Sequence, residues 1–301
     1  MIRIGTRGSP LALAQAHETR DRLVAAHRGL SFEIVVIKTT GDLIQDRALA
    51  QAGGKGLFTK EIDAAMLHGE IELAVHSSKD LPTAMPEGIA VVGFLPREDP
   101  RDALVSAKAA TVQDLPRAGT LGTASLRRQA QVKRLRPDLN VRLLRGNVET
   151  RLGKAERGEI DATLLAYAGL KRLGLAHRAV ALLSVEDFLP AVGQGAIALT
   201  ARPDDRDALD ALAPILDAPT GEAVACERAF LTVLDGSCKT PIAGYARSEG
   251  AKLLFRGAVY RIDGSETFEV ASEGAPGDAA EIGAAAGRDL LKRLPKGVLA
   301  G

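Results

Sequence analysis

Three short segments of the sequence place arginine at the start of a predicted helix. They are residues 6–10, 123–128 and 145–151, and each also supplies a Ser or Asn that can cap the helix. A helix N-terminus presents unpaired N–H groups and the positive end of the helix dipole, so it attracts anions. Arginine adds a planar fork that holds carboxylate or phosphate. Any one segment alone is better explained as an ordinary cap with solvated arginines, but the three together favour a cleft that binds several anionic groups.

A carboxylate lies in the segment 76–82, which follows directly after the predicted strand 71–75. Asp80 stands there beside Lys79, at the expected floor of the same cleft. The neighbouring ammonium group favours the ionised form of Asp80, and an ionised carboxylate in a positive cleft suits the stabilisation of a cationic intermediate. A turn-forming Asp before Leu81 and Pro82 explains the spacing equally well.

The two cysteines have different surroundings. Cys226 lies in an apolar helical pattern and is predicted to be part of a core. Cys238 lies in the loop 235–241 beside Lys239, where an exposed thiol near a cation has a lowered pKa and more thiolate. Cys238 is therefore a candidate nucleophile or covalent anchor, although a bystander loop cysteine is equally compatible with the sequence. No Cys or His pair has the spacing of a zinc site, so no metal is expected.

Two glycine-rich segments lack the patterns of nucleotide-binding loops. The stretch Gly53-Gly54-Lys55-Gly56 has no Ser or Thr after the lysine and no earlier glycine, so it is not a phosphate-binding P-loop. Gly193-Gln194-Gly195 lacks the third glycine of a dinucleotide fingerprint. Residues 41–56 form a long segment that ends in glycines, and we predict that they act as a mobile lid.

Composition and charge narrow the class of protein. The chain has 301 residues, a hydrophobic fraction of 46% and a net charge of +1, which argues against a general nucleic-acid binder. The charge is nevertheless uneven, because residues 117–157 hold eleven Lys or Arg and three Asp or Glu. We see no export signal and no apolar run long enough for a membrane span, so we expect a cytoplasmic protein that does not bind membranes.

The order of predicted elements indicates three domains of the α/β class. Strand and helix patterns alternate over 1–95, and a punctuated segment at 96–100 leads into a second alternating set. A further punctuated segment at 190–195 precedes a strand that we assign back to the first set. The prediction is two lobes of the periplasmic-binding-protein kind around a cleft that can open and close, followed by a small α+β domain. The boundaries are 1–95 with 196–217, then 101–189, then 221–301.

Seven motifs in this order resemble the porphobilinogen deaminase (hydroxymethylbilane synthase) family. The resemblance covers essentially the whole chain and is weakest in the last domain outside its cysteine loop. The motifs are Thr6-Arg7-Gly8-Ser9-Pro10-Leu11-Ala12, Gly53-Gly54-Lys55-Gly56-Leu57-Phe58, residues 76–82, residues 122–129, Arg145-Gly146-Asn147-Val148-Glu149-Thr150-Arg151-Leu152, residues 190–195 and the loop around Cys238.

The resemblance implies an activity and a set of roles. The implied reaction joins four porphobilinogen molecules stepwise with loss of ammonia, and hydrolysis releases the linear tetrapyrrole hydroxymethylbilane. The product would grow on a dipyrromethane cofactor held by a thioether to Cys238, with Asp80 as the catalytic carboxylate, in a monomeric enzyme. The implied cofactor ligands are Lys79, Ser125, Arg127 and Arg128, and the implied substrate ligands are Arg7, Ser9, Lys55, Arg145, Arg151, Arg172 and Gln194.

Two alternative functions remain open, and three positions differ from the family pattern. A two-lobed solute-binding protein for polycarboxylates shares the architecture but has no need for Asp80 or Cys238. A hydrolase using Cys238 with His76 would need residues from different domains and an oxyanion site that the sequence does not suggest. Positions where the sequence departs from the family pattern are Ser78, Thr200 and Ser237, none of which is assigned to the chemistry.

Overall fold

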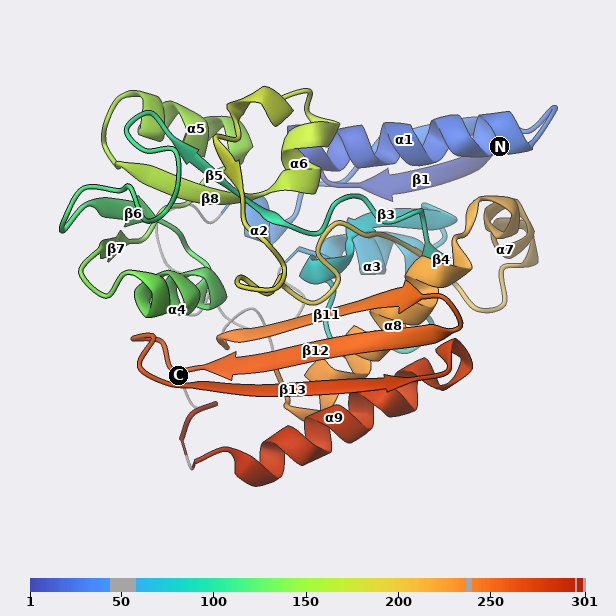
Figure 1. Cartoon of the computed structure of the whole chain (residues 1–301). Coiled ribbons are helices and arrows are strands. Elements are labelled where there is room, and N and C mark those ends of the chain that lie inside the picture. The colour runs from blue at the N-terminus through green and yellow to red at the C-terminus, as the bar shows by residue number, and fades with distance from the viewer. Residues whose placement is uncertain (44–57, 237–239, 296, 300–301) are drawn as a thin grey trace.

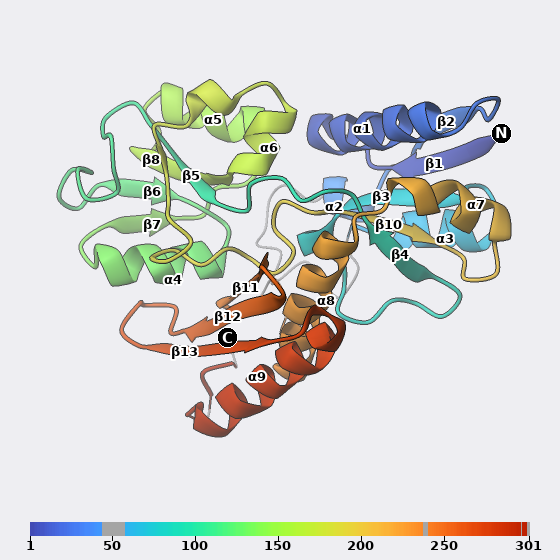
Figure 2. The ribbon, with the colours of Figure 1, turned by 45° about the vertical axis from the view of Figure 1, so that its right-hand side comes forward.

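The computed structural model describes residues 1–43, 58–236, 240–295 and 297–299. Within these ranges the strands form two five-stranded sheets and one three-stranded sheet. Figures 1 and 2 show the two larger sheets side by side as two lobes, with the third sheet and its helices below them. The predicted fold class, two α/β lobes followed by a small α+β domain, is confirmed.

The first lobe is built on the sheet ordered β2-β1-β3-β10-β4. β1 is parallel to β2 and β3, whereas β10 is antiparallel to β3 and β4. The first residue of β10, Ile197, therefore lies opposite Ser77, the last residue of β3. The elements of this lobe are β1 (Ile2–Thr6), α1 (Pro10–Ala26), β2 (Phe32–Val36), α2 (Thr40–Leu43), α3 (Lys60–Leu67), β3 (Leu73–Ser77), β4 (Ala90–Phe94), β10 (Ile197–Ala201) and α7 (Arg206–Leu212).

The second lobe repeats this arrangement with the order β7-β6-β8-β5-β9. β6 is parallel to β7 and β8, and β5 is antiparallel to β8 and β9. Asp102, at the start of β5, consequently lies opposite Ala166, at the end of β8. The elements are β5 (Asp102–Ser106), β6 (Thr120–Gly122), α4 (Leu126–Leu135), β7 (Asn140–Arg142), α5 (Val148–Glu156), β8 (Ala162–Ala166), α6 (Tyr167–Arg172) and β9 (Ala181–Leu182).

The third unit is an antiparallel sheet, β11-β12-β13, with two helices on one face. Its core contains Cys226, Phe230 and Phe255, all at most 1% exposed, so the prediction that Cys226 is a core residue is confirmed. Burial raises the pKa of the Cys226 thiol to about 12. The elements are α8 (Ala218–Val233), β11 (Ile242–Glu249), β12 (Lys252–Tyr260), β13 (Thr267–Gly274) and α9 (Ala279–Arg293).

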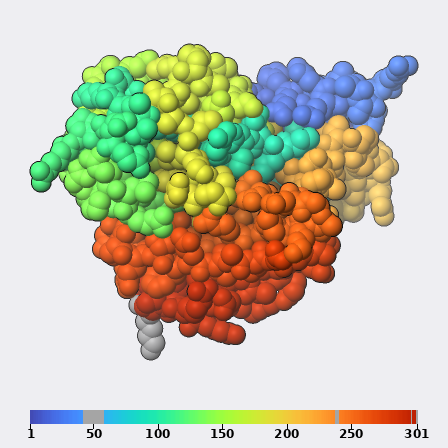
Figure 3. Space-filling view, viewed as in Figure 1, coloured from blue at the N-terminus to red at the C-terminus, as the bar shows by residue number. Residues whose placement is uncertain are grey.

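Apolar contacts join the third unit to both lobes. Val224 of α8 packs in one cluster with Leu81 and Ala196 of the first lobe. On the face of the sheet opposite its helices, Tyr260 packs in another cluster with Ala130 and Leu189 of the second lobe. The space-filling view in Figure 3 shows the third unit in continuous contact with the parts above it. The third unit therefore supports both lobes and both connections between them.

The structure differs from the predicted elements at the start of α8 and in several short or edge elements. Residues 218–220, which the predicted domain bounds leave as a boundary between 217 and 221, lie in the first turn of α8, because Oδ2 of Asp217 accepts a hydrogen bond from the Thr220 amide at 2.9 Å and caps the helix there. The edge strand β13, the two-residue strand β9 and the short helices α2 and α6 were not predicted. β13 carries alternating polar residues such as Glu269 and Glu273, which hide its strand pattern.

Among the described residues, no helix is long and apolar enough to cross a membrane.

Candidate active site

The three arginine-bearing segments begin helices, as predicted from their caps. The Ser9 hydroxyl accepts a hydrogen bond from the Ala12 amide at 3.3 Å, and the Ser125 hydroxyl accepts one from the Arg128 amide at 3.4 Å. Asn147 caps α5 in the same way, with its Oδ1 2.8 Å from the Thr150 nitrogen. α1 follows β1, α4 follows β6 and α5 follows β7. All three helices therefore start at the carboxyl edges of parallel strands, where α/β proteins bind anions.

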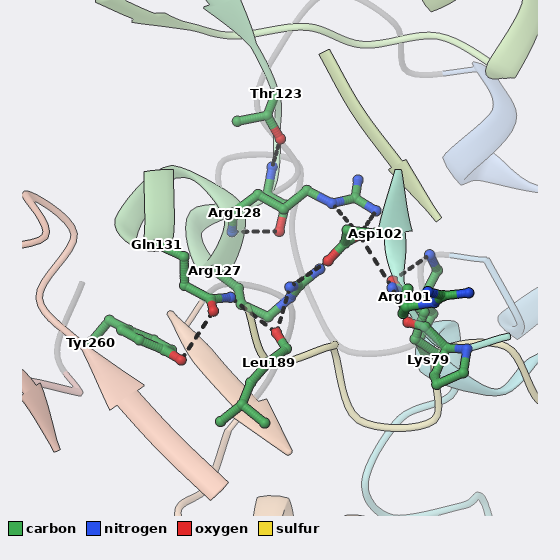
Figure 4. Close-up of polar contacts among 12 residues, drawn as sticks. Lys79, Arg101, Asp102, Thr123, Arg127, Arg128, Gln131, Leu189 and Tyr260 are labelled. Atoms are coloured by element: carbon green, nitrogen blue, oxygen red, sulfur yellow. Dashed lines mark hydrogen bonds and ion pairs between the residues drawn. The ribbon is translucent and has the colours of Figure 1, made fainter. Parts of the chain in front are cut away.

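Arg127 and Arg128 converge on one buried carboxylate, as Figure 4 shows. Nη1 of Arg127 lies 2.8 Å from Oδ2 of Asp102, and Nη2 of Arg128 lies 2.6 Å from Oδ1. Asp102 is fully buried and the two arginines are 4% and 6% exposed. Burial alone would raise the pKa of Asp102, but the two guanidinium groups outweigh it and hold the pKa well below its usual range. Neither arginine is solvated, contrary to the alternative of an ordinary cap.

Arg127 also has a fixed partner in the second lobe, beside the third unit. Its Nη1 donates to the carbonyl oxygen of Leu189 at 2.7 Å, and Nε2 of Gln131 donates to the same oxygen at 3.0 Å. The Tyr260 hydroxyl, from β12, donates to Oε1 of Gln131 at 3.2 Å. Figure 4 follows this chain of contacts from Tyr260 to Arg127. The orientation of Arg127 is therefore set jointly by the second lobe and the third unit.

Gln194 links the connection at 190–195 to the charged groups. Its Nε2 donates to the Pro100 carbonyl at 2.8 Å and to Oδ1 of Asp102 at 3.1 Å. Its Oε1 accepts from Nζ of Lys79 at 3.4 Å. Burial, and then the nearby charge of Arg128, lower the pKa of Lys79 to about 8, while Asp80 and Asp102 oppose the shift. One amide thus joins both connections between the lobes to the lysine beside Asp80.

Asp80 lies exposed in a single 3-10 turn, residues 78–80, that follows β3. Its charge acts on Lys79 and on Arg151. Burial, followed by the charges of Arg128 and Arg145, lowers the pKa of Arg151 to about 10. Nη1 of Arg145 is buried and has no hydrogen-bond partner among the described residues. We call Lys79, Arg127, Arg128, Arg145 and Arg151 the cationic cluster; Asp80 is the carboxylate at its exposed side.

Arg7 and His76 lie beside one another at the adjacent strand ends of the first lobe. The guanidinium carbon of Arg7 lies 4.1 Å from the centre of the Phe58 ring. His76 is 6% exposed, and burial together with the charge of Arg7 lowers its pKa to about 4. Nε2 of His76 lies 3.2 Å from Oγ1 of Thr200, so the departure from the family pattern at Thr200 falls on this contact. A buried imidazole with so low a pKa is a weak base, which counts against the hypothesis of a hydrolase that uses Cys238 with His76.

The sequence did not single out two residues of helix α8: Glu227, which holds the connections between the lobes, and Arg228, which contacts the segment after Asp80. Glu227 is fully buried and accepts hydrogen bonds from Arg97 at 2.5 Å, from the Gly193 amide at 2.7 Å and from the Ala246 amide at 2.8 Å. Arg228 donates to the carbonyl of Pro82 at 2.7 Å, two residues after Asp80. Both connections are therefore tied to the third unit. An acidic residue inside an apolar helical stripe was the signal available for Glu227.

Gly193 shows how closely these parts approach. It has a φ of +71°, which favours glycine, and a Cβ there would lie 2.4 Å from the hydroxyl oxygen of Ser78. Only glycine lets this connection pass beside the turn that carries Asp80 while its amide reaches Glu227.

Arg172 is held by partners outside the cationic cluster, and two of the predicted site residues lie outside the described part of the chain. Arg172 contacts Glu18 at 2.9 Å and the Gly195 carbonyl at 3.1 Å. Lys55 and Cys238, like most of the predicted lid, are outside the described residues. Among the residues that the structure describes, no three His, Cys, Asp or Glu side chains group as a metal site would require.

Comparison with known proteins was decisive for the family. The model described as "Porphobilinogen deaminase, dipyromethane cofactor binding domain" matches residues 2–210, and the C-terminal domain model of the same family matches 222–292. The chain belongs to the porphobilinogen deaminase family. Its enzymes act in tetrapyrrole synthesis, and the chain carries the family's cofactor-binding domain.

Curated relatives agree over nearly the whole length. Porphobilinogen deaminase of Nitrobacter hamburgensis is 56% identical over 96% of this chain and 92% of its own. The chloroplastic enzyme of Pisum sativum is 52% identical over 99% and 83%. Among solved structures, a nutrient binding protein from Burkholderia cenocepacia matches 71% of this chain and 90% of its own at 12% identity and a TM-score of 0.44. A periplasmic substrate-binding protein from Coxiella burnetii matches 76% and 97% at 15% identity and a TM-score of 0.45.

The cationic cluster fits the chemistry of a dipyrromethane group. Each pyrrole ring of such a group carries carboxylate side chains, and carboxylates pair best with guanidinium and ammonium donors. The cluster offers five such donors, and the buried Nη1 of Arg145 lacks a partner among the described residues. Asp102 leaves part of the Arg128 fork for an anion, whereas Arg127 is already held on two sides.

Proposed function

We propose that the chain is a transferase that joins four porphobilinogen molecules into hydroxymethylbilane, with Asp80 as its catalytic carboxylate. The observation that carries the proposal is the position of Asp80, an exposed carboxylate that interacts electrostatically with Lys79 and Arg151. Family membership supports the substrate and the product. It does not favour the alternative of a solute-binding protein, which would have no use for this carboxylate.

The reaction explains why a carboxylate is needed among cations. In each condensation the bond between the aminomethyl carbon and nitrogen of porphobilinogen breaks, a carbon–carbon bond to a second pyrrole ring forms, and the displaced ring proton leaves with ammonia as ammonium. Departure of ammonia leaves a cation conjugated with the pyrrole nitrogen. A carboxylate placed near the ring N–H can assist that departure and stabilise the cation. In this proposal Asp80 has both tasks.

The cations hold the carboxylates of the rings in position. Each porphobilinogen adds one acetate and one propionate, and bidentate arginines fix such groups in register for reaction. We assign Arg7, Ser9, Arg145 and Arg151 to the incoming substrate, with Lys55 and Arg172 as further substrate ligands. Gln194, through its contacts with Lys79 and Asp102, would keep both lobes in register.

The dipyrromethane cofactor would be held by a thioether to Cys238 and by Lys79, Ser125, Arg127 and Arg128. When bound, it supplies a ring position to which the first substrate unit is joined. Asp102 would act as a positioning residue, because it fixes Arg127 and Arg128 from behind. We further propose a cytoplasmic monomer with domains at 1–95 with 196–217, at 101–189 and at 221–301.

Intact mass spectrometry and two substitutions test the proposal. The purified protein should carry the added mass of a dipyrrole, and Cys238→Ser should lack it; an active protein of unmodified mass would refute the anchor. Asp80→Asn should bind porphobilinogen with little change in Kd but lose most turnover. The control is Asp289→Asn, which removes an exposed carboxylate paired with Arg293. Near-normal turnover of Asp80→Asn would refute the catalytic role.

A further inference from the structure

Helices α1 and α6 meet across the two lobes. Leu11 of α1 lies close to Gly169 of α6, where a Cβ would be 3.4 Å from a Leu11 methyl carbon. Leu11, Gln15 and Glu18 follow at helical spacing and share one face of α1. Gln15 contacts the Ser77 hydroxyl at 3.0 Å, and Glu18 contacts Arg172. Figures 1 and 2 both draw α6 beside the start of α1. This face of α1 therefore contacts both the second lobe and the strand end that precedes Asp80.

The two partners in the Glu18–Arg172 contact are unequally fixed. Nε of Arg172 lies 2.9 Å from Oε2 of Glu18, and Nη1 of Arg172 donates to the Gly195 carbonyl at 3.1 Å. The Arg172 side chain is 8% exposed, whereas that of Glu18 is 29% exposed. The other Glu18 oxygen lies 3.8 Å from Nε of Arg22, a loose contact within the same helix. Arg172 is thus anchored by backbone, and the Glu18 carboxylate is the group that can move away.

The Glu18 side chain has the chemistry of a substrate side chain. A glutamate carries two methylene groups and a carboxylate, which is a propionate group attached to Cα. Porphobilinogen bears the same group on its ring. A guanidinium fork that binds one propionate binds the other with similar geometry. Gly195, whose carbonyl orients Arg172, directly follows Gln194, which contacts Lys79.

We infer that Glu18 is an internal propionate that occupies Arg172 until a propionate of the pyrrole substrate displaces it. The inference rests on the proposed function, because it takes the substrate and the role of Arg172 from there. Glu18 then acts as a competitor, since every substrate carboxylate that reaches Arg172 must first break this ion pair. Its presence weakens substrate binding without any part in the bond-making step.

Glu18→Gln is the direct test, because it keeps the length of the side chain and removes the charge. A partly exposed ion pair contributes up to about 1 kcal/mol, so removal of the competitor should lower KM for porphobilinogen by about fivefold. kcat should stay within about twofold. Glu18→Asp keeps the charge on a shorter stem and should fall between the two proteins. An unchanged or raised KM in Glu18→Gln overturns the inference.

A binding measurement separates this inference from catalysis. In the Asp80→Asn background, calorimetric Kd for porphobilinogen should also tighten by about fivefold when Glu18→Gln is added. The gain must vanish when Arg172→Gln is present, because a double-mutant cycle isolates the pair. A gain that survives Arg172→Gln, or no gain in Kd, overturns the inference.

Glu98→Gln is the matched control, because the partner of Glu98 is Lys171, the residue of α6 next to Arg172. It removes the pair between Glu98 and Lys171, whose atoms lie 2.6 Å apart, and leaves the hydrogen bonds of Arg172 with Glu18 and Gly195 in place. It should not lower KM; an equal decrease would show that any loosening of α6 suffices and would overturn the inference. Failure of the unsubstituted protein to consume porphobilinogen would instead refute the proposed function, and the two failures are therefore distinct.

Discussion

Asp102→Asn tests whether the buried carboxylate organises the cationic cluster. Asp102 is fully buried, and its two oxygens lie 2.8 Å and 2.6 Å from Arg127 and Arg128. Removing one partner of a buried ion pair leaves uncompensated charge and costs about 3–5 kcal/mol. Because asparagine keeps one acceptor oxygen for Arg128 and Gln194, we expect the lower end, about 3 kcal/mol of unfolding free energy.

Guanidinium denaturation followed by far-UV circular dichroism provides the assay, since the chain contains no Trp. The control is Asp289→Asn. It removes an exposed ion pair with Arg293, so the midpoint of denaturation should barely change. The pKa of Asp102 is lowered by folding, so its contribution is complete above the unfolded pKa and is lost as pH falls through the folded pKa. The difference between the two proteins should therefore shrink in acid.

Primer loading gives a second measure of the same substitution. Without the carboxylate, Arg127 and Arg128 repel each other and lose their common anchor, so the fraction of protein carrying the dipyrrole mass should fall. A stability change below about 1 kcal/mol, together with normal loading, would refute the positioning role of Asp102.

Two further predictions concern buried acid–base groups. The imidazole of His76, whose pKa is about 4, should stay neutral from pH 8 to pH 5 in an NMR titration; a midpoint above pH 6 would contradict its burial against Arg7 and Thr200. Because the unfolded chain binds that proton near pH 6.5, stability should fall by about 3 kcal/mol as pH drops from there to about 4. Glu227→Gln should destabilise the protein by about 3 kcal/mol and speed hydrogen exchange of the Gly193 amide, which Glu227 accepts at 2.7 Å; unchanged exchange at Gly193 would argue against the tie between α8 and the connection.

Local chemistry explains why much of the site could be predicted. Ser9, Ser125 and Asn147 cap their helices through amides three residues away, and such short-range contacts depend only on neighbouring residues. The alternation of strands and helices likewise predicted two α/β lobes. Strand β13 was missed because its polar edge positions obscure the apolar ones at Phe268 and Val270.

The predicted connections between the lobes, at 96–100 and 190–195, illustrate the limit of such patterns. The sequence indicated two connections between the lobes, and the structure has both. It also ties them to one carboxylate, Glu227, and to one amide, Gln194. Glu227 and Arg97 are separated by 130 residues, so no local pattern reports their contact. Any opening of the lobes has to stretch or break these contacts.

The sequence by itself determined which residue types could do the chemistry: capped helix starts with arginine, the Lys79–Asp80 pair and a loop cysteine. Only the tertiary structure decided which of those charges are neutralised, and by what. Asp102 stands behind Arg127 and Arg128, and Glu18 occupies Arg172, through contacts that span 25 to 154 residues. The physical reason is that capping is decided within one turn of a helix. The charge state and orientation of a buried arginine are instead decided by whichever distant carboxylate the fold brings within hydrogen-bonding distance.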